Sequence, residues 1–324
     1  MSGLDEFDLI ARFFTRPAPN AVLGVGDDAA LLAVSPGMEL AVSTDMLVSG
    51  QHFFPDVDPY LLGHKTLAVN LSDLAAMGAT PRWATLSLAL PAAEAGWLEV
   101  FSRGLFDMAA RFDVSLVGGD TTRGPLNLNV TILGEVPAGQ ALRRSGARVG
   151  DDIWVSGDLG GAALGLRTLL GEVDLAELAN TDEVESCLTR LHAPEPRVAL
   201  GRALLGVAHA AIDISDGLLA DLGHILECSE AGAEIEYALL PAHPSVARRL
   251  PHILMQRCLL AGGDDYELCF TAAPERAHVV LAAAAAAGVH VTRIGHITAE
   301  PGLRMLSADG LVMRLEDTGF DHFN

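Results

Sequence analysis

The sequence predicts an α+β protein built from two domains of similar size. The chain has 324 residues, half of them hydrophobic, which is enough for two domains that each bury a core. Segments with strand and helix patterns alternate in both halves of the chain. Residues 137–150, rich in Gly, Ala and Arg, lie between the halves, so we place the domain boundary there.

In the first half, residues 126–136 alternate apolar and polar side chains, which is typical of a half-buried antiparallel strand. Asp58 and Pro59 predict the start of a helix, with Asp58 as its N-cap and Pro59 in the first turn, and Gly78 suits its end. The predicted strands are 40–44, 83–90, 115–117 and 126–136, and the predicted helices are 59–77 and 92–112.

The second half repeats this alternation. A glycine-rich turn follows the first predicted strand, and Asp216-Gly217 follows the second. The predicted strands are 152–156, 210–214, 266–271 and a region near 289–297, and the predicted helices are 162–170, 218–229 and 275–287.

Charge and lysine content exclude several functions. Asp and Glu number 42 against 21 Lys and Arg, a formal net charge of −21, which disfavours nucleic acid or an anionic membrane as the partner. Lys65 is the only lysine and follows His64, so the chain has no P-loop. The protein-kinase signature is also absent. Any phosphate chemistry must therefore use metal ions, backbone N–H groups or arginine.

The cysteines and the N-terminus favour a cytoplasmic protein. Cys187, Cys228, Cys258 and Cys269 form no C-x-x-C pair, so we interpret them as buried free thiols in a reducing compartment. The N-terminus has neither a basic segment nor an apolar stretch typical of a secretory signal. The longest apolar run, residues 279–289, is too short for a membrane span.

The placement of aspartates is the most informative feature of the sequence. Six short segments place Asp among apolar or small residues with few basic neighbours: 25–30, 42–45, 70–78, 117–122, 212–217 and 262–267. Such carboxylates repel one another and resist desolvation unless cations neutralise them. Oxygen ligands favour Mg²⁺, Mn²⁺ or Ca²⁺ over zinc, and Mg²⁺ commonly bridges carboxylates to phosphates. The pattern therefore points to metal-dependent phosphoryl chemistry.

Each feature also has a structural interpretation. Taken singly, the aspartates suit turns or helix caps. Gly118-Gly119 and the loop Gly157–Gly161 either allow close approach of backbone to a phosphate or form tight turns. Arg143, Arg144 and Arg148 are either solvated or phosphate ligands, and His52 is either a substrate contact or a core histidine.

Six motifs, in chain order, resemble those of the thiamine-monophosphate kinase family: G-V-G-D-D-A-A, S-T-D, N-L-S-D-L-A-A-M-G-A, G-G-D-T-T-R-G, I-D-I-S-D-G-L and G-G-D-D-Y-E-L. The resemblance extends from Phe7 to the closing segment 319–323. It implies the two-domain aminoimidazole ribonucleotide synthetase-like fold. Residues 1–140 would bind ATP and Mg²⁺ and dimerise through a β-barrel-like interface, and residues 148–324 would form an α/β sandwich that completes the substrate site.

The resemblance also implies an activity and a set of residue roles. The activity is ATP-dependent phosphorylation of thiamine monophosphate to thiamine diphosphate by a homodimer that uses several Mg²⁺ ions. Matched by motif, the metal ligands would be Asp28, Ser43, Thr44, Asp45, Asp73, Asp120, Asp213 and Asp216. The ATP contacts would be Gly119, Asp120, Arg144 and Ser215, and the thiamine monophosphate contacts would be His52, Asp264 and Phe320.

Two positions depart from the family pattern. The family usually has Glu where this chain has Asp264, and commonly Tyr or Trp where it has Phe320. We expect direct in-line transfer without a covalent intermediate or a general base, because the acceptor phosphate is already ionised. The alternatives are another ATP-dependent enzyme of the superfamily, such as an aminoimidazole ribonucleotide synthetase, a metal-dependent phosphohydrolase, or a non-catalytic Mg²⁺–nucleotide binding module.

Overall fold

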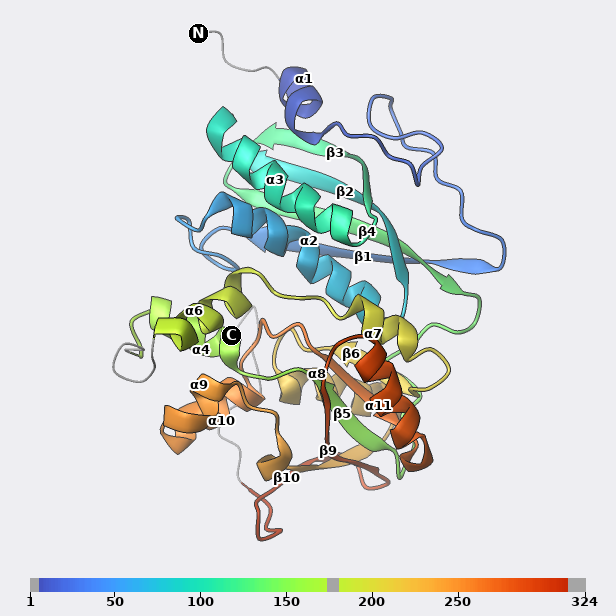
Figure 1. Cartoon of the computed structure of the whole chain (residues 1–324), viewed down its shortest axis with the longest axis vertical. Helices are drawn as coiled ribbons and strands as arrows, with labels where there is room; N and C mark the ends of the chain where they lie inside the picture. The colour runs from blue at the N-terminus through green and yellow to red at the C-terminus, as the bar shows by residue number, and fades with distance from the viewer. Residues whose placement is uncertain (1–5, 174–180, 314–324) are drawn as a thin grey trace. The chain divides into compact units, whose positions relative to one another are not determined.

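The protein is described here by a computed structural model that covers residues 6–173 and 181–313. The chain divides into two compact units, each of which combines helices with a β-sheet (Figure 1). Unit 1 comprises Met1–Leu74 and Ala79–Gly139, and unit 2 comprises Ala75–Gly78 and Gln140–Asn324. The predicted α+β class is confirmed.

Unit 1 contains a four-stranded sheet in the order β1-β4-β2-β3. Its strands are β1 (Met38–Val48), β2 (Thr80–Leu90), β3 (Ser115–Arg123) and β4 (Asn127–Pro137). The pairs β1–β4 and β4–β2 are antiparallel, whereas β2–β3 is parallel. Among the described residues β1 and β3 form open edges, so this chain alone does not close a barrel.

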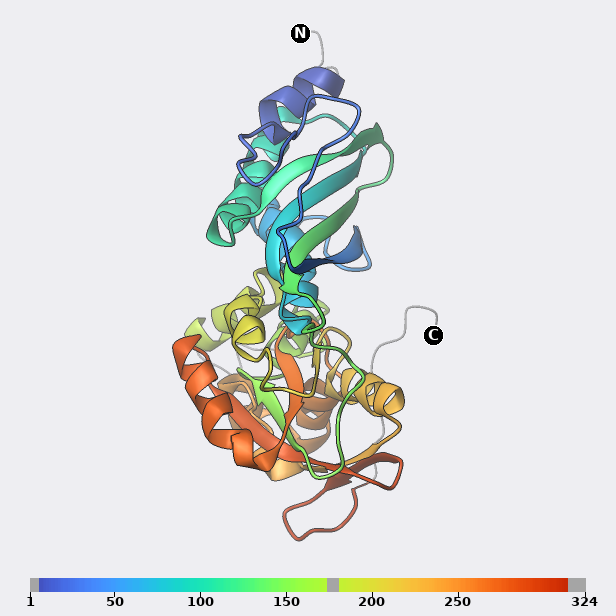
Figure 2. The ribbon, with the colours of Figure 1, turned by 90° about the vertical axis from the view of Figure 1, so that its right-hand side faces the viewer.

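Helices cover one face of this sheet. Figures 1 and 2 show α2 (Pro59–Ala76) and α3 (Ala95–Arg111) lying side by side against it. The predicted cap of α2 is confirmed, because Asp58 Oδ1 accepts the backbone N–H groups of Tyr60 and Leu61 at 2.7 and 3.3 Å. A short N-terminal helix α1 (Glu6–Leu9) continues into a π-helical turn η1 (Ile10–Phe14).

The opposite face of β1 is apolar and exposed. Leu40, Val42 and Met46 are 42%, 56% and 52% exposed. Residues two apart in a strand point to the same face, so these side chains form one stripe along β1. An exposed apolar stripe of this kind is typical of an interaction surface.

In the described part of unit 2, a six-stranded sheet has the order β10-β7-β9-β5-β8-β6; β10–β7 is parallel and the other pairs are antiparallel. The strands are β5 (Asp152–Ser156), β6 (Ala210–Asp213), β7 (Gly232–Glu236), β8 (Leu268–Ala272), β9 (Val291–Thr298) and β10 (Gly302–Leu306). The helices are α4 (Gly161–Leu169), α6 (Thr181–His192), α7 (Val198–Ala203), α8 (Leu218–Ser229), α9 (Pro244–Arg249), α10 (His252–Leu260) and α11 (Ala277–Ala286), with short 3₁₀ turns η2 (Tyr237–Leu239) and η3 (Pro274–Arg276).

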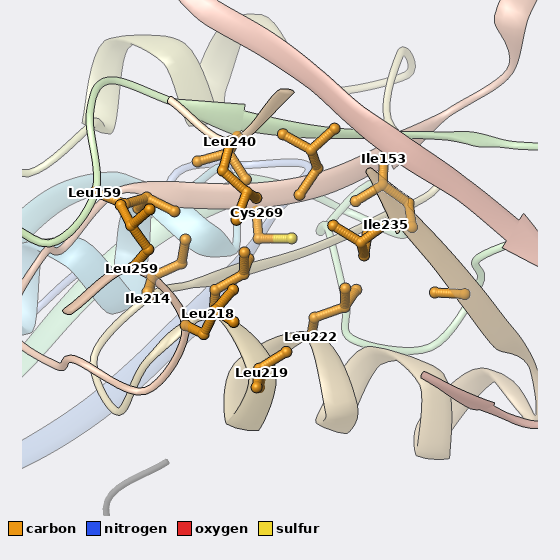
Figure 3. Close-up of a cluster of buried hydrophobic side chains, with 14 of the residues drawn as sticks. Ile153, Leu159, Ile214, Leu218, Leu219, Leu222, Ile235, Leu240, Leu259 and Cys269 are labelled. Carbon is orange, nitrogen blue, oxygen red and sulfur yellow. The ribbon is translucent and has the colours of Figure 1, made fainter. Parts of the chain in front are cut away.

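Helix α8 packs its apolar face onto this sheet. Figure 3 shows Leu218 and Leu222 of α8 directed toward Ile153, Ile235 and Cys269, all of them at most 2% exposed. Burying each large apolar side chain contributes roughly 1.5–3 kcal/mol of transfer free energy. This packing fixes where α8 begins, and its first turn follows the acidic motif at residues 213–217.

Several predictions differ from the structure at element boundaries. Strands β1 and β3 continue past their predicted ends, so Asp45 and Asp120 lie inside strands. The segments 181–203 and 232–260 contain elements that the alternation pattern did not predict. Three cysteines are buried free thiols as predicted, whereas Cys228 is exposed. None of the described helices is long and apolar enough to cross a membrane.

A buried carboxylate joins three parts of unit 2. Glu267 is fully buried and pairs with Arg197, whose Nε donates to Glu267 Oε2 at 2.6 Å, and with Arg190 Nη1 at 3.2 Å. Ser156 Oγ donates to the same carboxylate at 2.6 Å. Because Glu267 precedes β8 and Ser156 ends β5, this network ties both strands to the segment that precedes α7.

Replacing Glu267 should therefore destabilise the fold strongly. We expect Glu267→Gln to lower the free energy of unfolding by about 3–5 kcal/mol, because it leaves a buried guanidinium uncompensated. Glu172→Gln is the control, since its ion pair with Arg167 is solvent-exposed and should contribute less than about 1 kcal/mol. Urea unfolding measures both variants, and equal losses would contradict the structural role of Glu267.

Candidate active site

Unit 1 contains a cavity of about 620 Å³ that is lined by residues of β2 and β3, by residues 25–30 and by the N-terminal helical segment. Three of its lining side chains, Asp27, Asp28 and Asp120, are carboxylates, and no Lys, Arg or His is among the residues that line it. The apolar part of the wall includes Phe7, Ile10, Phe14, Leu86, Leu88, Leu116 and Val117. The cavity thus combines an apolar wall with an acidic one that needs cations to accept a phosphate.

Gly118 and Gly119 line the cavity with main-chain atoms of β3. Gly119 has φ of 149°, and a Cβ at this position would lie 1.8 Å from the carbonyl oxygen of Leu86, its partner in β2. Only glycine fits such an approach. Gly118, Gly119 and Asp120 are part of β3, and this edge strand therefore presents main chain and one carboxylate to the same space.

A second acidic cluster joins β1 to α2. Ser43 Oγ donates to Asp73 Oδ2 at 2.5 Å, and Asn70 Oδ1 accepts the backbone N–H of Asp45 at 3.1 Å. Asn70 and Asp73 are three residues apart on α2 and share a face. Thr44 points to the other side of β1, where its Oγ1 donates to Val130 O at 3.0 Å.

His52 lies in the turn after β1. Its Nδ1 accepts the backbone N–H of Val48 at 3.1 Å. An acceptor at Nδ1 places the proton of the neutral ring on Nε2. The turn therefore holds the imidazole in the tautomer that has Nε2–H as a donor.

In unit 2, two loops place acidic motifs side by side. Asp264 N–H donates to Ser215 O at 2.9 Å, and Tyr266 N–H donates to Ile214 O at 2.8 Å. Asp264 and Tyr266 have φ of 66° and 49°, the left-handed region that costs energy for residues other than glycine. These bonds bring Asp264 beside Ser215 and so beside the motif that contains Asp213 and Asp216.

A carboxylate that sequence reasoning missed supports this motif. Asp221 is 3% exposed, and its Oδ2 accepts backbone N–H groups of three consecutive residues, Ser215, Asp216 and Gly217. Burial raises the pKa of Asp221 to about 7, against the lowering effect of these bonds. Its position in the first turn of α8 was the available signal, because acidic residues there bind exposed N–H groups.

The loop Gly157–Gly161 is closed by a carboxylate as well. Gly160 N–H donates to both oxygens of Asp265, at 3.0 Å each. Burial raises the pKa of Asp265 well above its usual range. The possible use of Gly160 for phosphate is therefore not supported, because its N–H already has a buried partner.

Arg144 is exposed, and its backbone is held in place. Ser229 Oγ donates a hydrogen bond to Arg144 O at 3.2 Å, and Ser229 Oγ in turn accepts the N–H groups of Gly146 and Ala147 at 3.2 Å each. Ser229 ends α8, so one helix contacts the acidic motif at its start and the arginine segment at its end.

The structure thus places the candidate residues in three groups, each within one unit. Asp28, Gly119 and Asp120 line the cavity of unit 1; Ser43, Asp45 and Asp73 form the β1–α2 cluster; and Asp213, Ser215, Asp216 and Asp264 lie on the paired loops of unit 2. Within residues 6–173 and 181–313, no three His, Cys, Asp or Glu side chains are arranged as a ready-made metal site. Phe320 lies outside the described residues.

Comparisons with known proteins agree along nearly the whole chain. Residues 26–136 match the N-terminal domain model of AIR synthase related proteins, and residues 148–307 match the C-terminal one. Thiamine-monophosphate kinase of Escherichia coli K12 is 46% identical over 321 residues, 98% of each chain.

Solved structures extend this similarity to the fold. A thiamine-monophosphate kinase from Stenotrophomonas maltophilia K279a is 47% identical, with a TM-score of 0.84 over 94% of this chain and 95% of that one. A structure described as AaThiL complexed with AMPPCP and TMP is 30% identical, with a TM-score of 0.76 over 99% and 97%.

Proposed function

Because the chain belongs to the thiamine-monophosphate kinase family, we propose that it transfers the γ-phosphoryl group of ATP to the phosphate of thiamine monophosphate. The observation that carries this proposal is 46% identity over 98% of both chains. The related structure with AMPPCP and TMP holds an ATP analogue together with that second ligand, which supports ATP as the donor.

The negative charge of the proposed site means that binding of phosphate-bearing reactants requires cations. Two phosphate-bearing reactants must approach carboxylates in a chain with a formal charge of −21. Three carboxylates without a lining base in the unit 1 cavity fit oxygen ligation of divalent cations. When bound, Mg²⁺ would neutralise phosphate oxygens and favour in-line displacement.

The residues of unit 1 have distinct roles in this proposal. Asp28 and Asp120 hold cations in the cavity, and Gly119 lets the nucleotide phosphates approach the main chain of β3. Ser43, Thr44, Asp45 and Asp73 supply further oxygen ligands. His52 donates Nε2–H to the phosphate of thiamine monophosphate.

The residues of unit 2 are proposed to act from the paired loops. Asp213 and Asp216 supply carboxylate ligands, and Ser215 and the guanidinium of Arg144 contact ATP. Asp264 faces the cationic thiamine moiety, where a carboxylate is electrostatically favourable. The acceptor phosphate is already ionised, so none of these residues has to remove a proton.

We also propose that the protein is a homodimer that associates through the β1 face of unit 1. Leu40, Val42 and Met46 present an exposed apolar stripe there. A second copy would remove this stripe from water, which is the main source of free energy in such interfaces.

The activity is tested by incubating the purified protein with Mg·ATP and thiamine monophosphate. We expect thiamine diphosphate and ADP in equal amounts, and no phosphate release when the acceptor is omitted. Release of inorganic phosphate from ATP alone would favour a phosphohydrolase, and ADP formation only with an aminoimidazole ribonucleotide precursor would favour the related synthetase.

Asp120→Asn should reduce turnover about 100- to 1000-fold, as expected for loss of one preorganised electrostatic contact. The matched control is Asp113→Asn, because Asp113 is exposed on unit 1 and its φ of 54° suits asparagine. Steady-state kinetics at saturating Mg²⁺ measures both. Equal activities for the two variants would contradict the role of Asp120.

Val42→Glu should convert the dimer to a monomer, because a charge in the apolar stripe is costly to bury. Val312→Glu is the control, since Val312 is 64% exposed on unit 2. Light scattering after gel filtration gives the mass of each variant. A dimeric Val42→Glu protein, or a monomeric wild type, would rule out this interface.

A further inference from the structure

One carboxylate oxygen holds the loop that carries Ser215 and Asp216. Asp221 Oδ2 accepts the N–H groups of Ser215, Asp216 and Gly217 at 3.0, 3.0 and 3.1 Å. Asp221 is itself fixed, because it is 3% exposed and its own N–H donates to Gly217 O at 3.0 Å in the first turn of α8.

We propose that Asp221 is a positioning residue for Ser215 and Asp216, an inference that rests on the proposed function for the roles of those two residues. The three N–H groups that Asp221 accepts belong to residues 215–217, which come directly before α8. Asp221 thereby fixes the orientation of these peptide units and of the Ser215 hydroxyl and Asp216 carboxylate that they carry, which the proposed contacts with ATP and a cation require.

The second loop fixes the same segment from another side. A Cβ on Gly263 would lie 2.4 Å from Ser215 O, and Asp264 N–H donates to that oxygen. A Cβ on Gly217 would lie 2.9 Å from the main chain of Ala261. With Asp221 on one side and residues 261–264 on the other, the peptide units of Ser215 and Asp216 have little freedom to turn.

Asp265 and Gly160 form a related arrangement elsewhere in unit 2. Both oxygens of Asp265 accept the single N–H of Gly160 at the N-cap of α4, whereas one oxygen of Asp221 accepts three N–H groups before α8. Two glycine-containing turns in this unit are thus closed by internal carboxylates. Of these two carboxylates, Asp221 is the one that accepts N–H groups from residues with a proposed binding role, Ser215 and Asp216.

The experiment compares Asp221→Ala and Asp221→Asn with Glu227→Ala, a control that removes an 83% exposed carboxylate from the same helix. The readouts are the Mg²⁺ concentration for half-maximal activity and the hydrogen exchange of amides 215–217. We expect Asp221→Ala to raise the required Mg²⁺ about 10- to 100-fold, as for loss of a residue that orients a metal ligand, and to speed exchange at these amides.

Asp221→Asn retains a carbonyl oxygen, so it should stay much closer to wild type in Mg²⁺ requirement while exchange at amides 215–217 becomes faster. This variant keeps the test valid if the alanine protein fails to fold. Wild-type exchange at these amides in either Asp221 variant would overturn the proposal, as would an unchanged Mg²⁺ requirement in Asp221→Ala. If the wild type forms no thiamine diphosphate, the proposed function fails, while the exchange measurement still tests the positioning role.

Discussion

The repulsion between negative charges is the constraint on which the proposed site depends. The unit 1 cavity has three carboxylates and no basic lining residue, and both proposed reactants carry phosphate. Such a cavity favours cations strongly and anions only in their company. The single lysine, Lys65, is 3% exposed and is not part of a P-loop, so a P-loop lysine is not available for phosphate binding. In the function proposed above, divalent cations held by acidic side chains would mediate the contact instead.

The backbone next to these carboxylates is also constrained, by glycines with close contacts and by N–H groups with fixed partners. In unit 1, Gly119 is required because Leu86 O lies where a side chain would begin, and this brings edge strand β3 to the cavity wall. In unit 2, by contrast, the turns before α4 and α8 donate their N–H groups to Asp265 and Asp221. The two units therefore differ in how their glycine-containing segments are used.

The sequence predicted much of the fold because its local signals agree with the tertiary structure. The alternation at residues 126–136 and the Asp58-Pro59 start gave β4 and α2 nearly to the residue. The end of β3 was missed because glycines normally weaken a strand, whereas here pairing with β2 carries the strand through them. Elements such as β7 and β10 depend on long-range pairing, which a local pattern does not reveal.

The same distinction applies to the site. Motif residues such as Asp28, Asp120 and Asp216 could be identified because their residue types and neighbours are unusual for a solvated surface. Asp221 and Glu267 could not, since a carboxylate in a helix or a strand end looks ordinary until its partners are known. Their partners, three successive N–H groups in one case and two arginines in the other, come together only in the fold. Burial without such partners would be prohibitively costly, so the partners explain why these two acids can be buried.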